Sequence, residues 1–274
     1  MALATGTIVV ACPGPGLGGP TRGLFAVDPT SGQQRTLAQG GMLAEPWNVV
    51  FLADGRLLVA DASAFDTGGL VAIDPANGQQ TKVASSSQFR SPFGLALAPD
   101  GRVVVAYTLH QFPAGSSRVA LVDPATGEDH EIAHGFPFVQ PFAVAVDAAG
   151  NVIVTDPGDF TGLSRLVRFD IGVGASIRHD GDGAFSGIAV EPTGNLVVTS
   201  DVPERQQLLR FHPTSGPPTV VSRVPTGLTG GVAVEATGAI LVTDVNGVLR
   251  VDPVTGAQTT VASMRGAVGL AVRR

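Results

Sequence analysis

Several residue types that often mark a class of protein are scarce in this sequence. There is one cysteine, Cys12, so the chain cannot form an intrachain disulfide, and its cysteine content leaves the redox compartment open. There is one lysine, Lys82, and the net charge is −6, so no cationic stripe is present to neutralise phosphates. We therefore expect no nucleic acid partner.

Long apolar runs are also missing. No run reaches the roughly 18 residues that a transmembrane helix needs. Residues 1–4 lack the charged region and the long apolar region of a signal peptide. We therefore expect no membrane partner, and a protein that is either cytoplasmic or secreted with its leader already removed.

Glycine and proline, in contrast, are abundant, at 36 and 20 residues, which is typical of many short strands separated by tight turns. A unit of about 45 residues recurs along the chain. One glycine before the second strand of each unit recurs at steps of 44 to 49 residues: Gly6, Gly55, Gly101, Gly150, Gly194 and Gly238. A turn of the form Asp-Pro-x-x-Gly keeps the same spacing, at residues 28–32, 74–78, 123–127 and 252–256, with weaker forms at 170–174 and 212–216.

Six copies of one unit predict an all-β, six-bladed β-propeller with four antiparallel strands per blade, formed by residues 1–274 as a single domain. In the second copy we expect strands at residues 49–52, 56–60, 70–74 and 79–84. The first copy has no segment for its first strand, whereas residues 269–272 repeat the pattern of 94–97. We therefore expect the C-terminal strand to pair with the N-terminal blade and close the ring.

The connections divide between the two faces of the ring. Those that join first to second strands and third to fourth strands are short and nearly identical, so one face consists of structural hairpins. The loops that join second to third strands lie on the opposite face and vary greatly, from residues 12–20 and 107–113 to 244–247. Repeat proteins usually carry function on the variable face, so we expect the site there.

The sequence resembles a group of known propellers. Residues 231–244, followed by 249–253, look like an NHL repeat, and gluconolactonase/regucalcin-like and streptogramin-lyase-like propellers share the pattern. The gluconolactonase resemblance implies a divalent metal held by Glu, Asn and Asp at the channel mouth. Before its first strands this chain has other residues: Trp47, Phe93, Phe142, Ser186, Gly230 and Val268. Only Glu45 resembles the first-blade glutamate of that family, and the His and Glu of streptogramin lyases are not matched, so we carry over neither mechanism.

The residue six positions after each marker glycine is expected at the end of a second strand: Cys12, Asp61, Tyr107, Asp156, Ser200 and Asp244. Three carboxylates around the channel mouth suit an acid/base pair or a calcium ion, which is the one cofactor considered. In the alternative, each Asp accepts backbone N–H groups of its own loop. The candidate catalytic residues are Asp61, Asp156, His110 and Tyr107.

Aromatic residues gather on the variable face. Nine of the 13 Phe fall in its loops or at the start of a first strand: Phe65, Phe89, Phe93, Phe112, Phe136, Phe138, Phe142, Phe160 and Phe185. They predict an off-centre, aromatic-lined pocket in blades two to four, with Asp61 and Asp156 at its floor, for an uncharged hydrophobic ligand or an organic cation. The candidate ligand-binding residues are Trp47, Phe93, Phe142, Glu45, Phe112, Phe160 and Asp244. In the alternative, Phe93 and Phe142 plug the channel and pack between blades.

Two functions stay open from the sequence. The first is a small-molecule-binding propeller, either a binder or an enzyme of the lyase or hydrolase type. The second is a protein-interaction scaffold or sensor that uses the same loops, because exposed aromatic residues are also typical of binding hot spots. The partner is thus a small molecule or a protein, and we expect the chain to be a monomer.

Overall fold

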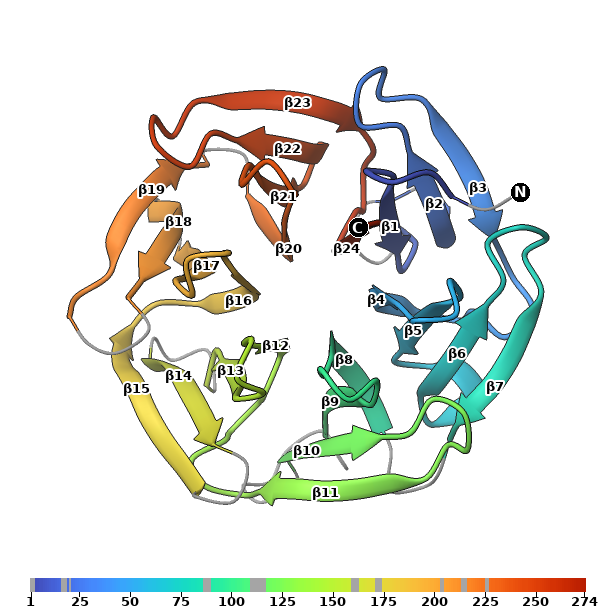
Figure 1. The fold of residues 1–274 in the computed structure, drawn as a ribbon, viewed down its shortest axis with the longest axis horizontal. Coiled ribbons are helices and arrows are strands. Elements are labelled where there is room, and N and C mark those ends of the chain that lie inside the picture. Colours follow the sequence, from blue (N-terminus) through green and yellow to red (C-terminus); the bar gives the residue numbers. More distant parts are fainter. Residues whose placement is uncertain are drawn as a thin grey trace.

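A ring of six β-sheets makes up the protein. The computed structural model describes residues 3–15, 19, 21–85, 90–108, 117–158, 163–170, 174–202, 205–212, 216–224 and 227–274. Within them each sheet has four antiparallel strands (Figure 1), so the expected six-bladed β-propeller is confirmed. No helix in these ranges is long and apolar enough to cross a membrane.

Each blade runs from an inner strand beside the central axis to an outer strand at the rim (Figure 1). Blades one and two consist of β24 (Gly269–Val272), β1 (Ile8–Cys12), β2 (Gly23–Val27) and β3 (Gln34–Ala38), then β4 (Pro46–Phe51), β5 (Leu57–Asp61), β6 (Gly69–Ile73) and β7 (Gln80–Ala84). Blades three and four consist of β8 (Arg90–Leu97), β9 (Val103–Thr108), β10 (Ser117–Val122) and β11 (Asp129–His134), then β12 (Ala143–Val146), β13 (Val152–Asp156), β14 (Leu163–Asp170) and β15 (Gly174–Asp182). Blades five and six consist of β16 (Phe185–Val190), β17 (Leu196–Val202), β18 (Arg205–Phe211) and β19 (Thr219–Arg223), then β20 (Leu228–Val234), β21 (Ile240–Asp244), β22 (Gly247–Val251) and β23 (Gln258–Ser263).

The core lies between neighbouring blades. Second strands such as β5 and β13 are buried at all five positions, because a blade packs against each of their faces. Their Val-, Leu- and Ile-rich sequences suit a strand that is covered on both sides. Six clusters of buried apolar residues fill the ring, and each draws its members from two adjacent blades. Every interface therefore depends on both of its blades.

The strand β24 closes the ring. It pairs with β1 in antiparallel register, with Ile8 opposite Val272 and Ala11 opposite Gly269. Beside this ladder, the Arg273 N–H donates to the Thr7 carbonyl at 2.9 Å. The predicted pairing of the C-terminal strand with the N-terminal blade is confirmed, so the first and last blades leave no open edge between them.

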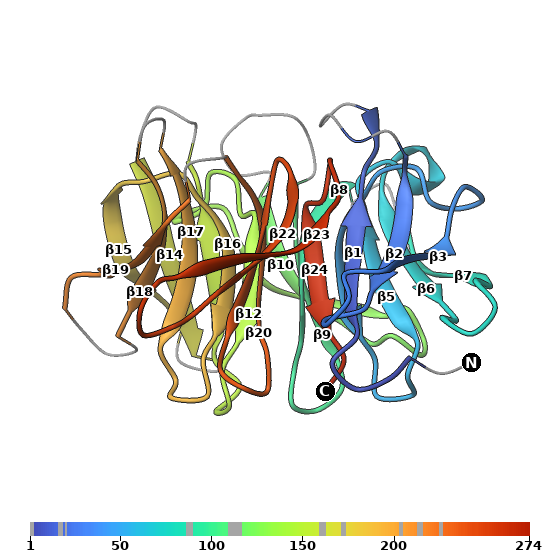
Figure 2. The same ribbon diagram turned by 90° about the horizontal axis from the view of Figure 1, so that it is seen from above.

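The two faces of the ring differ in their connections. Figure 2 shows tight turns on one face and longer connections on the other. We call the first the turn face; it carries the connections from first to second and from third to fourth strands. The opposite, loop face carries the remaining connections, including the 3-10 helix η2 (Ala64–Asp66). The C-terminus lies on the turn face beside the central opening (Figures 1 and 2).

On the turn face, two arginines connect neighbouring blades. Arg210 makes two hydrogen bonds to Glu191, at 2.8 and 2.6 Å, and donates to a carbonyl of the Asp-Pro turn in the next blade at 3.0 Å. Arg250 repeats the arrangement with Glu235, at 2.7 and 2.8 Å, and reaches the next such turn at 3.1 Å. Because a guanidinium group matches a carboxylate in two parallel hydrogen bonds, each arginine is held while it bridges two blades.

Candidate functional site

The residues expected at the ends of the second strands are found there, one strand away from the channel that the first strands border. All six are at most 3% exposed: Cys12, Asp61, Tyr107, Asp156, Ser200 and Asp244. Their side chains are therefore buried where the loops begin. The role of each carboxylate follows from its hydrogen bonds.

Asp61 joins two connections of the loop face. Its carboxylate accepts N–H groups from Ala44 and Glu45, both at 2.8 Å, in the connection that precedes β4. It also accepts N–H groups from Ser63 at 3.1 Å and Ala64 at 2.7 Å in its own loop. Burial raises the pKa of Asp61, and these four amides oppose that rise. The loop contacts are those that the structural alternative predicts.

Asp156 repeats this arrangement two blades further on. It accepts the N–H groups of Val139 at 2.6 Å and Gln140 at 3.0 Å, and that of Gly158 at 2.8 Å in its own loop. Burial raises its pKa, while the three amides and the charge of Arg165 oppose the rise. Both aspartates thus anchor a loop to the connection that enters the same blade.

The other candidate catalytic and metal-binding residues are separate from one another. Asp244 accepts the N–H groups of Asn246 and Gly247, at 2.9 and 2.7 Å. Burial raises the pKa of Tyr107 to about 12, so its phenol stays protonated at neutral pH. Glu45 accepts a hydrogen bond from the Ser63 hydroxyl at 2.6 Å. In the parts of the chain that the structure describes, no three His, Cys, Asp or Glu side chains gather as metal ligands would.

Three of the predicted ligand-binding residues do come together. The rings of Trp47 and Phe93 meet edge to face at 5.2 Å, those of Trp47 and Phe142 at 5.9 Å, and Phe93 stacks on Phe142 at 5.5 Å. We call these residues the aromatic cover. A Cβ added to Gly230, in blade six, would lie 3.2 Å from the Phe142 ring, so that ring extends from blade four to blade six. The cover therefore lies at the loop-face end of the channel, just before the inner-strand residues that line it.

Other aromatic residues of the described ranges lie apart from the cover. Phe138 and Phe185 are at most 3% exposed and lie in the clusters between blades. Phe136 is 81% exposed, with the Arg165 guanidinium 5.7 Å from its ring centre. Three predicted site residues, His110, Phe112 and Phe160, lie outside the described residues.

One polar atom of the aromatic cover has no hydrogen-bond partner among the residues that the structure describes. This atom is the buried Trp47 Nε1. A buried donor without an acceptor costs about 1–3 kcal/mol, and such atoms are rare in folded proteins. The sequence placed Trp47 at the site, but the state of its N–H depends on neighbours from other blades.

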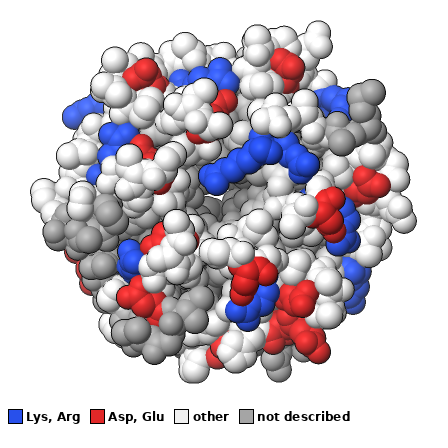
Figure 3. All heavy atoms as spheres, viewed as in Figure 1, with Lys and Arg blue, Asp and Glu red and all other residues white. Residues whose placement is uncertain are grey.

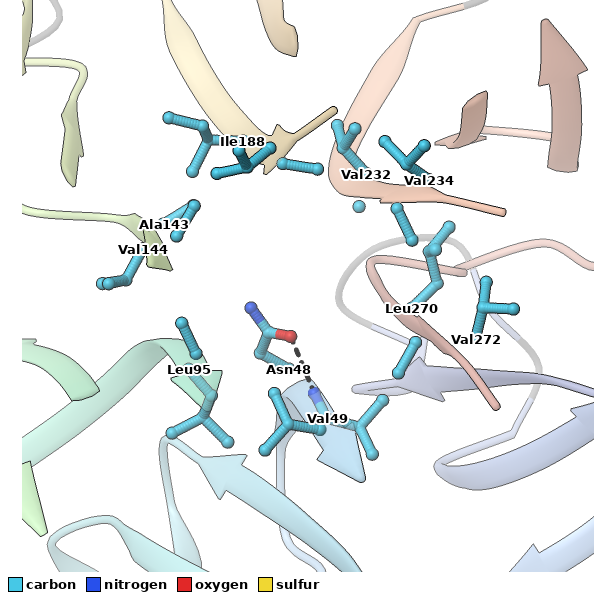
Figure 4. A pocket seen from close by; sticks show the side chains of 18 of the residues that line it. Asn48, Val49, Leu95, Ala143, Val144, Ile188, Val232, Val234, Leu270 and Val272 are labelled. Atoms are coloured by element: carbon cyan, nitrogen blue, oxygen red, sulfur yellow. Dashed lines mark hydrogen bonds between the residues drawn. The ribbon is translucent and has the colours of Figure 1, made fainter. Parts of the chain in front are cut away.

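The central channel expected from the sequence contains a cavity along the axis of the ring. It measures about 220 Å³ and is bordered by the six inner strands, from β4 to β24. At the turn face it continues into a hollow of about 610 Å³, with which it shares Val146, Val190, Val234 and Arg274. Figure 4 shows Asn48 among the aliphatic side chains of the wall. A comparison of the repeats could have singled out Asn48 as an unusual residue of the channel wall. The other copies have Gly or Ala at its position: Gly94, Ala143, Gly187, Gly231 and Gly269.

Comparisons with known proteins define the class of the fold. No family model and no curated protein matches the sequence. A chain from the crystal structure of a nidogen/laminin complex superimposes with a TM-score of 0.77, at 14% identity, over 98% of each chain. A gluconolactonase from Xanthomonas campestris gives 0.70, at 15% identity, over 97% of this chain and 91% of that one. A protein proposed to be a gluconolactonase gives 0.68, at 21% identity, over 86% and 83%.

These likenesses confirm the fold that the sequence resemblance implied. The protein is a six-bladed β-propeller of the shape found in gluconolactonase-like structures. The same shape occurs in the nidogen/laminin structure, so it defines an architecture and leaves the function to the residues of the site.

Proposed function

We propose that the protein is a ligand-binding propeller whose aromatic cover receives an uncharged, apolar molecule with a hydrogen-bond acceptor. The observation that carries this proposal is the unpartnered, buried Nε1 of Trp47 within a group of three rings. An acceptor on the ligand would satisfy that N–H group. The faces and edges of the rings would contact the apolar body of the molecule.

The acidic groups near the cover support binding over turnover. Asp61 and Asp156 are buried, and their oxygens accept four and three amide hydrogen bonds. A carboxylate in this state holds loops in place and has little freedom to move a proton to or from a ligand. A lyase or hydrolase reaction remains the alternative function. Such a reaction would release a measurable product, whereas binding alone would not.

The chain offers its own reporter for this test. Trp47 is the only Trp, so its fluorescence follows the site without a label. Dihydrocoumarin is an appropriate probe, because it is a neutral aromatic lactone with a carbonyl acceptor and a gluconolactonase shares the fold. We expect dihydrocoumarin to quench Trp47 fluorescence in a saturable way and to be recovered unhydrolysed.

The variant Trp47→Phe keeps a ring and removes the N–H group. We expect it to weaken dihydrocoumarin binding, measured by calorimetry, by about fivefold, the value of one hydrogen bond. Phe169→Leu, a change in the core between blades three and four, is the control and should leave binding unchanged. Equal affinities of the wild type and Trp47→Phe would refute the proposal. Hydrolysis that Asp156→Asn abolishes would establish the enzymatic alternative instead.

A protein partner is the second candidate function. Phe136 is 81% exposed beside Arg165, and aromatic and arginine side chains together are typical of binding hot spots. The nidogen/laminin structure shows that this propeller shape occurs in a protein complex. Phe136→Ser should then remove a cross-linked product formed in extracts of the source cells, without any effect on dihydrocoumarin binding.

A further inference from the structure

The central channel is a separate cavity from the aromatic cover. The cover lies at its loop-face end, while the turn-face end opens into the wider hollow. Each inner strand pairs on one side only, with the second strand of its blade. The other edge of each inner strand presents backbone N–H and C=O groups to the channel, and such groups need partners. The channel therefore suits a molecule with polar groups that can form hydrogen bonds.

Among the described residues that line the channel, Asn48 is the one with an uncharged polar side chain. Its Oδ1 accepts the Val49 N–H at 2.8 Å, which fixes the orientation of the amide. Figure 4 shows the amide nitrogen turned towards the space between the inner strands. Asn48 thus presents two N–H donors near the loop-face end of the channel.

Arg274 is the one charged side chain among the lining residues, and it lies at the open end. The acidic residues of the wider hollow are each paired with an arginine of their own blade: Asp147 with Arg168, Glu191 with Arg210, and Glu235 with Arg250. No ion pair of Arg274 occurs among the described residues. Figure 3 shows basic side chains beside the central opening on this face. The Arg274 guanidinium at the mouth of the channel therefore has no acidic side chain of the described residues as its partner.

We infer that the channel is a second binding site, for a short, linear oxo acid. The carbonyl group would accept hydrogen bonds from Asn48 at the loop-face end, and the carboxylate would pair with Arg274 at the turn-face end. The chain between them would lie against aliphatic residues such as Ile188 and Leu270. The carboxylate stays at the mouth, where water still reaches it, so no unpaired charge is buried.

The ligand test uses three small molecules of similar length. The probe is 5-oxohexanoate, which has both polar groups; hexanoate lacks the carbonyl group and 2-hexanone lacks the carboxylate. We expect calorimetry to show binding of 5-oxohexanoate, with each comparator at least about tenfold weaker. Failure of 5-oxohexanoate to bind the wild-type protein, or equal binding of all three molecules, would overturn the inference.

Two variants test the two ends of the site. Asn48→Asp keeps an oxygen for the Val49 N–H and removes both side-chain donors, so it should weaken 5-oxohexanoate about tenfold or more. Arg274→Gln should have a similar effect. Its control is Arg273→Gln, because the Arg273 guanidinium lies 5.4 Å from the Phe51 ring centre and does not line the channel. Unchanged affinity in Arg274→Gln would overturn the inference, whatever the stability of Asn48→Asp. Trp47→Phe should keep 5-oxohexanoate binding, which separates this site from the aromatic cover.

Discussion

Gly127 lies against the backbone carbonyl of Val83 in the preceding blade, and a Cβ on Gly127 would be only 2.2 Å from that oxygen. Val83 is the unpaired residue of a β-bulge, where the pairing of β6 with β7 shifts. Three other turn glycines approach a bulge of the preceding blade in the same way, at 2.3, 2.7 and 2.2 Å: Gly32 at Val261, Gly78 at Leu37 and Gly256 at Val221. The glycine of the Asp-Pro-x-x-Gly turn therefore forms a close packing contact between neighbouring blades.

This contact predicts that two glycine substitutions differ in their loss of stability. Gly127 and Gly216 both have a positive φ, of +77° and +102°, but a Cβ added to Gly216 would have no atom of the described residues within 4 Å. Gly216→Ala should cost about 1 kcal/mol, from backbone strain alone. Gly127→Ala should cost about 1–3 kcal/mol more, because the Val83 backbone must move. Urea unfolding measures both losses, and equal losses would show that the contact has no energetic weight.

Loss of the Asp61 carboxylate should destabilise the protein far more than loss of an exposed one. Asp61→Ala leaves four backbone N–H groups of two connections without their acceptor, and we expect a loss of about 3 kcal/mol or more in the free energy of unfolding. Asp54→Ala is the control. Asp54 is paired with Arg56 at the surface, and such pairs contribute about 0.2–1 kcal/mol. If both variants lose a similar amount of unfolding free energy, the structural role of Asp61 is wrong and Asp61 is again a candidate functional residue.

The fold could be predicted from the sequence because the turn and strand patterns that specify it are local and recur in every copy. The marker glycines lie in hairpin turns with positive φ, as at Gly101 and Gly150, and one correct interpretation of a turn holds for every copy. The boundaries expected in the second copy differ from those of β4 to β7 by at most three residues. Ring closure could also be predicted, since the segment 269–272 has the pattern of an inner strand.

The site was harder to predict because it depends on contacts between distant segments. The sequence indicated that Asp61 ends a strand, but half of its donors come from Ala44 and Glu45, in another connection. Of the predicted aromatic residues, Trp47, Phe93 and Phe142 lie together. Whether Phe142 lines a pocket or closes the channel depends on the missing side chain of Gly230, two blades away.

The arginine bridges on the turn face should contribute more than ordinary surface ion pairs. Arg250→Met keeps the apolar part of the side chain and removes its three hydrogen bonds, which leaves Glu235, only 12% exposed, without its partner. We expect a loss of about 2 kcal/mol in thermal or urea unfolding. Arg56→Met, in the exposed pair with Asp54, is the matched control and should change stability by less than about 1 kcal/mol. Equal losses of stability in Arg250→Met and Arg56→Met would mean that the hydrogen bond to the next blade does not strengthen the ion pair.

Deletion of residues 268–274 should have an effect out of proportion to its length. It removes β24, exposes the edge of β1 and takes Leu270 from the cluster between blades six and one. We expect a large fall in melting temperature, together with oligomers in size-exclusion chromatography as the exposed β1 pairs with another copy. Deletion of residues 273–274 alone keeps the ladder of β24 and should cost much less. A synthetic peptide of residues 266–274 should restore the monomer by adding the missing strand, and an unchanged melting temperature in the longer deletion would show that the ring does not depend on this pairing.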